Sequence, residues 1–199
     1  MKIYLVRHGQ SEGNLRDLWY GSTDLPLTDL GRQQAREAGE KLRNIPFAAC
    51  YVSPLSRARE TAELVLAGRE VPVTVVDDLR EQHMGVLETM TVADIRRDLP
   101  ELYAEMQHDW LRADPPEGES FANSLAPRVA AALDAIVAKG EDCLIVAHNG
   151  PLTFAVAHLL QLPLDVAGRL YLQQGTYTMV ELGGEYYNSA RALLRCFNK

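Results

Sequence analysis

The sequence predicts an α/β fold with three layers, in which helices cover both faces of a mainly parallel sheet. Short apolar runs rich in β-branched residues alternate with longer segments of helical periodicity over the first 76 residues, and the alternation resumes after residue 119. Strands and helices that alternate along a chain build a parallel sheet flanked by helices. The length of 199 residues is that of one domain with a sizeable core. We therefore expect a single domain over residues 1–199.

The predicted strands are short apolar runs bounded by charged, glycine or proline positions. In chain order they are residues 2–6, 47–52, 71–76, 142–147, 171–173, 176–182 and 186–194. The run 142–147 is expected to be a buried strand. The pair Gly183-Gly184 separates the last two runs and predicts a tight hairpin turn between them.

Each predicted helix begins at a residue that favours a helix start. Thr28 has the side chain of an N-cap, and apolar residues then recur at near-helical spacing to about residue 44. Ser120 is the expected N-cap of a long helix that reaches about Lys139. The remaining helices are predicted to open at Ser56 and near Pro151.

Residues 78–119 interrupt the alternation and predict an excursion from the sheet. Thr91 and Asp94 have the spacing of a capping box at a helix start, and a second amphipathic stretch follows. Either these side chains line a substrate entrance or they pack the excursion onto the core: Tyr103, Met106 and Trp110. Because no linker is long enough for a second domain, we expect this segment to form a cap over the site.

Composition excludes several function classes. The 20 Lys and Arg residues against 27 Asp and Glu residues give a net charge of -7, whereas nucleic acids and anionic membranes attract basic surfaces. The longest apolar run, residues 47–52, is far shorter than the ~20 residues that span a bilayer. The apolar run 3–6 is also too short for a signal peptide. The dispersed cysteines, Cys50, Cys143 and Cys196, predict reduced thiols in a cytoplasmic protein.

Charged and titratable side chains stand where the predicted strands end. Arg7 and His8 follow the first strand, Arg57 lies in the first turn of the helix after the second, and His148 follows the run 142–147. Ligands of open α/β sheets bind beyond the carboxyl ends of the strands, so these residues are expected to converge. Two guanidinium groups, two imidazoles and a helix N-terminus together make a site for a phosphoryl group.

A carboxyl group is predicted beside this site. Glu81 follows the third strand, and a bound dianion would keep it protonated, so it could donate a proton to a leaving alkoxide. Glu88 is an alternative acid a few residues further on. A metal site built from His8, His148, Glu81 and His83 is disfavoured, because two arginines nearby would repel a cation. We therefore expect no metal and no cofactor.

Residues 7–14 (RHGQSEGN) resemble the signature R-H-G-x-[ST]-x-x-N of the histidine phosphatase superfamily, the phosphoglycerate mutase-like proteins. Other segments are similar to further motifs of the family and follow in its order. They are residues 27–35, 53–62, 79–81 with Gly85, 118–120 and 147–150. The resemblance implies the phosphoglycerate mutase-like fold and metal-independent hydrolysis of a phosphomonoester.

The resemblance also implies a role for each residue of the site. His8 would attack phosphorus in line and form a phosphohistidine, while Glu81 would protonate the departing oxygen and later help water attack. The groups expected to hold the phosphoryl oxygens are Arg7, Arg57, His148 and Asn14. The further residues expected to contact the substrate are Tyr20, Gly21 and Asn149.

The sequence departs from the family at positions that bear on the substrate. Asn149 stands where glycine is usual after the second histidine, and Tyr20 where many members have a small or amide residue. Leu87 and Thr89 replace the tryptophan and glycine common after the acid. None of these changes removes a catalytic group.

Hydrolysis is favoured over phosphoglycerate mutase activity. The chain is shorter than the cofactor-dependent mutases it resembles, and 195–199 do not form an extended tail that would exclude water from a phosphohistidine. Similarity to bacterial broad-specificity and α-ribazole phosphate phosphatases predicts a small phosphorylated metabolite as substrate. The alternatives are the mutase reaction and a non-catalytic protein that binds a phosphorylated ligand. The sequence leaves a homodimer open.

Overall fold

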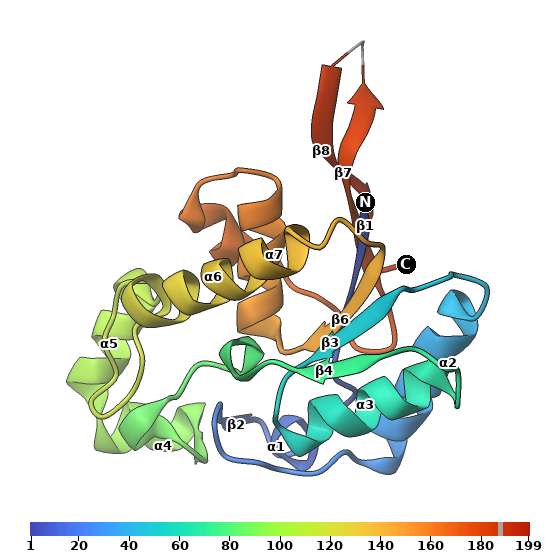
Figure 1. Ribbon diagram of the computed structural model, residues 1–199. Helices are drawn as coiled ribbons and strands as arrows, with labels where there is room; N and C mark the ends of the chain where they lie inside the picture. The colour runs from blue at the N-terminus through green and yellow to red at the C-terminus, as the bar shows by residue number, and fades with distance from the viewer. Residues whose placement is uncertain (187–188) are drawn as a thin grey trace.

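The computed structural model describes residues 1–186 and 189–199, and within them six strands form one sheet (Figure 1). They are β1 (Lys2–Arg7), β3 (Ala49–Val52), β4 (Val73–Val75), β6 (Cys143–Ala147), β7 (Thr178–Tyr186) and β8 (Ser189–Cys196). Their spatial order is β4-β3-β6-β1-β7-β8. The first four strands in that order run parallel, whereas β7 and β8 are antiparallel to their neighbours. The predicted, mainly parallel sheet is confirmed.

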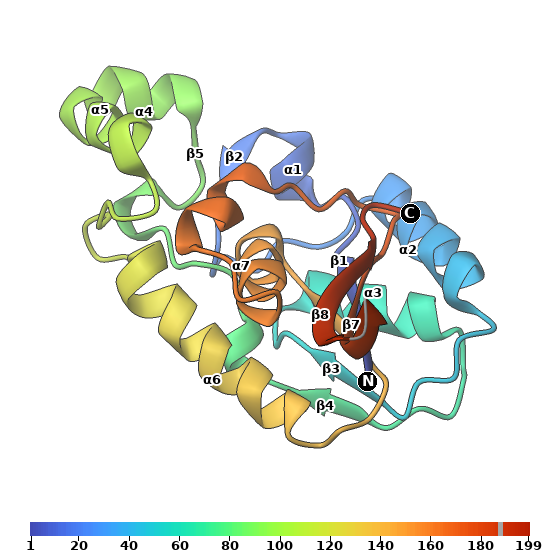
Figure 2. The ribbon, with the colours of Figure 1, turned by 90° about the horizontal axis from the view of Figure 1, so that it is seen from above.

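Helices lie on both faces of this sheet. They are α2 (Asp29–Leu42), α3 (Ser56–Leu66), α6 (Ala126–Val137) and α7 (Asn149–Leu159). Figure 2 shows α6 and α7 on one side of the strands and α2 and α3 on the other. Thr28 is the N-cap of α2, since its hydroxyl accepts a hydrogen bond from the Gly31 N–H at 3.1 Å. The long helix predicted at Ser120 begins as a π-helical turn, Phe121–Leu125, before α6.

Successive side chains of β1 point to opposite faces of the sheet, and a hydrophobic layer forms on each face. Ile3 and Leu5 face the cluster built with α6 and α7, whereas Tyr4 and Val6 face the cluster built with α2 and α3. Burying a side chain of this size stabilises the fold by about 1.5–3 kcal/mol. The central strands are therefore held from both faces, which fixes the positions of the residues that follow them.

Residues 77–119 contribute no strand to the large sheet within the described chain. This segment contains α4 (Val92–Asp98) and α5 (Pro100–Asp109), and its strand β5 (Met90–Thr91) pairs with β2 (Leu18–Trp19). The predicted capping box forms, because the Thr91 hydroxyl and the Asp94 carboxylate are joined at 2.6 Å. The segment packs around its own small cluster of Leu87, Ile95, Met106 and Ala113.

Two predictions near the C-terminal end of the chain are wrong. Residues 171–173 form no strand; they belong to an irregular segment whose backbone bonds to side chains instead. Gly183-Gly184 is not the hairpin turn, because both glycines lie inside β7 at a register shift between Glu181 and Gly184. Gly183 has φ +70°, a conformation that suits such a bulge. The predicted strand 186–194 includes residues 187–188, which lie outside the described residues.

The segment predicted as a loop between β1 and α2 contains one short helix, α1 (Glu12–Leu15), as well as β2. Ser11 and Asn14 form a capping box around this single turn, and the sequence signal is too short to predict it. The remaining differences are at element ends: the run 47–52 becomes strand only from Ala49, and 71–76 shortens to β4.

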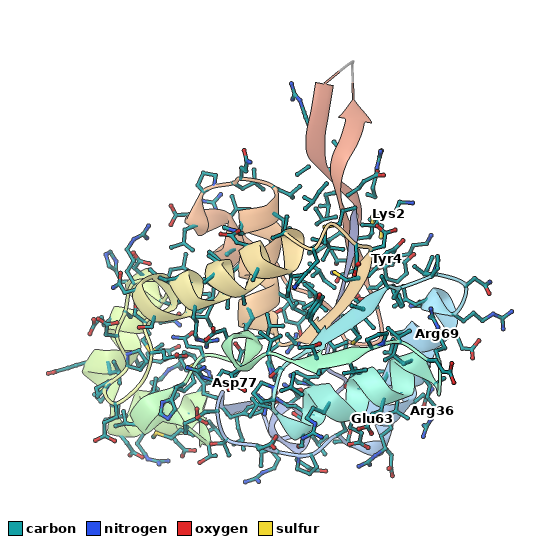
Figure 3. All side chains as sticks on the ribbon, in the orientation of Figure 1. Lys2, Tyr4, Arg36, Glu63, Arg69 and Asp77 are labelled. Carbon is teal, nitrogen blue, oxygen red and sulfur yellow. The ribbon has the colours of Figure 1, made fainter. Side chains whose placement is uncertain are left out.

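Charged residues cover the outer faces of the helices. Arg36 on α2 and Glu63 on α3 are exposed, and their side chains point away from the sheet (Figure 3). Among the helices of the described residues, none is long and apolar enough to cross a membrane.

Candidate active site

The predicted site residues meet at the carboxyl ends of the parallel strands. Arg7 is paired with Ala147 at the ends of β1 and β6, and β3 ends beside them. A cavity of about 560 Å³ opens there. One wall is polar and the other is mainly apolar. The polar wall comprises Arg7, His8, Asn14, Arg57 and Glu81.

His8 is held in one orientation and one tautomer. Its Nδ1 lies 2.7 Å from the Gly9 carbonyl oxygen, which can only accept a hydrogen bond, so Nδ1 carries the proton and Nε2 the lone pair. The side chain is 3% exposed. Burial, and then the charges of Arg57 and Arg7, lower the pKa of His8 well below its usual value. The imidazole is therefore neutral and nucleophilic at physiological pH.

His148 lies next to His8, with 5.1 Å between the ring centroids. Its Nε2 is 2.7 Å from the Ser53 hydroxyl, and its Nδ1 accepts a hydrogen bond from Nε of Arg57 at 3.3 Å. Burial, followed by the charge of Arg57, lowers the pKa of His148 well below its usual value. Sequence reasoning missed Ser53, although it is the first residue of a motif that we had singled out.

Arg57 has protein partners on all three guanidinium nitrogens. Besides the bond to His148, Nη2 donates to the Gly21 carbonyl at 2.6 Å and Nη1 to the Thr23 carbonyl at 3.0 Å. The Tyr20 ring lies 4.8 Å from the guanidinium carbon, a cation–π contact. Gly21 thus supports Arg57 and does not line the cavity, and a Cβ there would lie 1.5 Å from the Gln82 carbonyl oxygen.

Arg7 is buried but has fewer partners. Its Nη1 donates to the Leu172 carbonyl at 3.1 Å, and the Tyr171 ring lies 4.9 Å from its guanidinium carbon. Its Nε is buried and has no hydrogen-bond partner in the described part of the chain. Leaving a buried donor unpaired costs about 1–3 kcal/mol.

Asn14 and Tyr20 line the cavity beside the arginines. The Asn14 Oδ1 accepts from the Ser11 N–H at 3.1 Å and from Nε2 of Gln174 at 2.8 Å. Its amide nitrogen is the donor that could serve a ligand. The Tyr20 hydroxyl bonds to the Ser11 hydroxyl, which orients the ring against Arg57.

Glu81 and Glu88 have opposite environments. Glu81 lines the cavity, and burial raises its pKa against weaker opposing effects of the Gln82 N–H and Arg57. Partial burial also raises the pKa of Glu88, but hydrogen bonds from Thr23, Met84, Gly21 and Ser22 outweigh it and lower the pKa to about 2. Glu81 is therefore the carboxyl group that can carry a proton, whereas Glu88 stays ionised and joins two loops.

Comparison with known proteins agrees with this geometry. The model of the histidine phosphatase superfamily (branch 1) matches residues 3–193. The chain belongs to this superfamily. The adenosylcobalamin/alpha-ribazole phosphatase of Salmonella typhimurium is 36% identical over 187 residues, which cover 92% of this chain and 91% of that protein. A 2,3-bisphosphoglycerate-dependent phosphoglycerate mutase of Gloeobacter violaceus is 35% identical, over 74% of this chain and 70% of its own.

Solved structures of phosphatases have the same fold. The alpha-ribazole phosphatase of Shigella flexneri superposes with a TM-score of 0.91 at 29% identity, covering 100% of this chain and 96% of that one. A mycobacterial glucosyl-3-phosphoglycerate phosphatase gives a TM-score of 0.84 at 28% identity, with coverages of 99% and 98%. The protein is thus a phosphatase that hydrolyses phosphomonoesters, and phosphoglycerate mutase activity has less support.

The other wall of the cavity in this histidine phosphatase is apolar. It comprises Leu18, Trp19, Met84, Met106 and Trp110, with Gln107 at its side. Trp110 also packs edge-on against Phe121, with ring centroids 4.9 Å apart, so it both lines the entrance and joins the core. Among the described residues that line this cavity, the cationic groups are confined to the polar wall.

The residues that line the cavity do not include His148, Asn149 or His83, which were singled out from the sequence. Asn149 points behind the polar wall, where its Oδ1 accepts from the Leu172 N–H at 3.1 Å. His83 bonds through Nδ1 to the Gly85 N–H at 2.9 Å. No group of three or more His, Cys, Asp or Glu side chains in the described ranges is arranged to hold a metal ion. Sequence reasoning missed Leu172 and Gln174, because their contacts join positions about 160 residues apart.

Proposed function

We propose that this phosphatase removes the phosphoryl group from a metabolite whose alcohol carries a flat, apolar group, by way of a phosphohistidine at His8. The observation that carries the substrate class is the apolar wall of the cavity, where two indoles and two thioethers surround the space outside the arginines. Aromatic rings and thioethers favour contact with flat apolar groups. α-Ribazole phosphate, a benzimidazole riboside phosphate, fits this description.

The first half of the reaction transfers the phosphoryl group to the protein. Nε2 of His8 has a free lone pair and attacks phosphorus as the bond to the ester oxygen breaks. Glu81 gives its proton to that oxygen, so the alcohol leaves neutral. The raised pKa of Glu81 supports this role, since the carboxyl group must be protonated when the ester binds.

The second half returns the site to its starting state. Water attacks phosphorus, its proton passes to the Glu81 carboxylate, and the bond between phosphorus and Nε2 breaks. Phosphate leaves, and His8 is again neutral. The same acid acts as a base because the second step reverses the proton demand of the first.

Arg7, Arg57, His148 and Asn14 would hold the three non-bridging oxygens. Arg7 supports this role because it lines the cavity beside His8 and Asn14. Such pre-aligned donors act mainly on the charge that spreads over the equatorial oxygens in the transition state.

The mutase alternative requires a site for the carboxylate of phosphoglycerate. The apolar wall supplies no cation for that group, which disfavours phosphoglycerate relative to an uncharged alcohol. The binding-protein alternative would require that His8 lacks a lone pair directed at the ligand, contrary to its bond with Gly9.

The test is a comparison of kcat/KM for α-ribazole 5′-phosphate, ribose 5-phosphate and 3-phosphoglycerate, with His8→Ala as the blank. The first two esters share the ribose and differ by the base, so they form a matched pair. We expect at least about a tenfold preference for α-ribazole 5′-phosphate, the value of one well-filled apolar contact. Equal rates on the matched pair would contradict the substrate class. Fast isomerisation of 3-phosphoglycerate with a trace of 2,3-bisphosphoglycerate would favour the mutase, and a wild type no faster than His8→Ala would favour a binding protein.

We also propose that the enzyme works in the cytoplasm of a bacterium, on a small metabolite and with neither nucleic acid nor membrane as partner. The three cysteines are free, and burial raises the pKa values of Cys50 and Cys143 to about 12, which keeps these thiols unreactive. The net charge of -7 supports the absence of polyanionic partners. A homodimer stays a prediction.

A further inference from the structure

A short irregular segment contacts the polar wall of the cavity. Residues 171–174, here called the strap, lie between the 3-10 turn Leu164–Arg169 and β7. The Leu172 carbonyl accepts the hydrogen bond from Nη1 of Arg7 at 3.1 Å, and the Tyr171 ring lies beside the same guanidinium. Gln174 donates to the Asn14 side chain at 2.8 Å. The strap thus holds two of the groups proposed to bind phosphoryl oxygens.

Two asparagine side chains hold the strap. Asn149, in the first turn of α7, accepts from the Leu172 N–H at 3.1 Å. Asn198, which follows β8, makes two bonds: its Oδ1 accepts from the Gln173 N–H and its Nδ2 donates to the Tyr171 carbonyl, both at 2.9 Å. The backbone of Asn198 has φ +53°, a left-handed conformation that Asn tolerates better than most residues. Neither asparagine lines the cavity.

The two arginines of the cavity differ in how they are held. Arg57 has partners on Nε, Nη1 and Nη2, and these partners are spread over loops and a histidine. Within the described part of the chain, Arg7 donates to the Leu172 carbonyl, and its buried Nε is unpaired. The orientation of Arg7 therefore depends on where the strap places that carbonyl.

We propose that Asn149 and Asn198 are positioning residues for phosphoryl transfer, which act through the strap on Arg7. The proposal rests on the proposed function of Arg7 as a ligand of the phosphoryl group. Asn198 accepts from the Gln173 N–H, which belongs to the same planar peptide unit as the Leu172 carbonyl that holds Arg7. Asn149 accepts from the Leu172 N–H and so fixes the peptide unit that precedes that carbonyl.

A double-mutant cycle tests whether Asn149 acts through Arg7. Asn149→Ala, Arg7→Ala and the double variant are compared in kcat/KM on p-nitrophenyl phosphate and in the inhibition constant of orthovanadate. We expect Asn149→Ala to lower kcat/KM about tenfold, less than the ~10²-fold that a 1 Å misplacement can cost. Inhibition by orthovanadate should weaken to a similar extent. In the Arg7→Ala background, Asn149→Ala should cause no further loss, because the group it positions is gone.

The matched control is the same cycle with Arg57→Ala. The contacts of Arg57 do not include the strap, so the losses from Asn149→Ala and Arg57→Ala should multiply. Losses that also multiply with Arg7→Ala would show a merely structural role and overturn the proposal. An Asn149→Ala variant with wild-type inhibition by orthovanadate would overturn it as well.

Variants of Asn198 give a graded second test that does not disturb α7. Asn198→Gly accepts the left-handed backbone but removes both bonds to the strap, and Asn198→Asp keeps only the acceptor. We expect about a tenfold loss for Gly, as for Asn149→Ala, and a smaller one for Asp, both absent when Arg7 is alanine. If Asn149→Ala does not fold, this series alone decides the proposal in the same cycle.

The outcomes separate this proposal from the proposed function. If Arg7→Ala leaves inhibition by orthovanadate unchanged, the role of Arg7 in the proposed function is wrong, and the positioning role is wrong with it. If Arg7→Ala weakens inhibition but neither asparagine variant does, only the positioning role is wrong.

Discussion

The two walls of the cavity are built in different ways. The polar wall includes His8, which follows β1, and His148 lies next to it after β6 without lining the cavity; hydrogen bonds fix each ring. The apolar wall comes mostly from residues 77–119 and from β2, outside the large sheet. In the proposed reaction this difference separates two tasks: the sheet would fix the groups that act on phosphorus, and the excursion would supply the surface that contacts the alcohol.

Glu81 lies where the two walls meet, and its loss should give the largest effect. Glu81→Gln removes the proton donor, which we expect to slow hydrolysis of alkyl phosphates by about 10²–10⁴-fold. Hydrolysis of p-nitrophenyl phosphate should change far less, because p-nitrophenolate leaves without protonation. The measurement is kcat/KM over a series of esters with leaving groups of increasing pKa. Equal losses across the series would show that Glu81 does not act as the acid.

The pH profile of the same variant sharpens this prediction. The acid must be protonated, so activity of the wild type on alkyl phosphates should fall as the pH rises through the raised pKa of Glu81. Glu81→Gln should lack that alkaline decrease.

Arg57→Ala should cause the next largest loss of activity, and the loss should be equal for all esters. Removing a pre-aligned donor of this kind costs about 10²–10³ in rate. Because Arg57 is proposed to bind the phosphoryl group and not the alcohol, the loss should be the same for alkyl and aryl phosphates. A loss confined to one class of ester would mean that Arg57, in the polar wall, also acts on the alcohol part of the substrate.

Trp110→Ala should change substrate preference more than general activity. Loss of the indole removes an apolar contact, which we expect to lower kcat/KM for α-ribazole 5′-phosphate about tenfold relative to ribose 5-phosphate. Tyr103 offers a matched control: it packs in the small cluster and contacts Arg96 at 5.0 Å, and it is not among the residues that line the cavity. If Trp110→Ala and Tyr103→Ala shift the preference equally, Trp110 acts only by packing.

Glu88→Gln should give the smallest effect, on stability and not on the chemical step. The pKa of Glu88 is about 2 when folded, below its ordinary value, so the ionised carboxylate stabilises the fold above about pH 4.5 and the gain is lost as the pH falls towards 2. After allowing for solvent screening, we expect Glu88→Gln to lower the free energy of unfolding at pH 7 by about 1–2 kcal/mol. Urea unfolding at pH 7 and at pH 3 measures it: the wild type and the variant should differ at pH 7 and approach each other at pH 3. An equal difference in the free energy of unfolding at pH 7 and pH 3 would mean that the ionised carboxylate is not the source of the stabilisation.

The sequence predicted the polar wall better than the apolar one. His8, Arg57 and His148 lie at one edge of the sheet, because parallel strands end together and each residue directly follows a strand or opens a helix. The supports of these residues could not be predicted in the same way. Leu172 reaches Arg7 from 165 positions away, and no periodicity indicates such a contact.

The errors in the fold have local causes. Gly183-Gly184 has the composition of a hairpin turn, but β7 accommodates it as a bulge because pairing with β8 continues on both sides. Residues 171–173 have the composition of a strand, yet their N–H and carbonyl groups bond to Asn149, Asn198 and Arg7. Composition alone does not reveal which partner a backbone group will take.

The carboxylate of Glu88 limits how the enzyme can be redesigned. It accepts hydrogen bonds from the N–H groups of Gly21 and Thr23, whose carbonyls hold Arg57, and from the N–H of Met84, which lines the apolar wall. A graft that exchanged only the wall for that of another phosphatase would remove the anchor of the loop beneath the guanidinium. Transplants of substrate preference into this scaffold must therefore carry residues 20–23 and 81–88 as one piece.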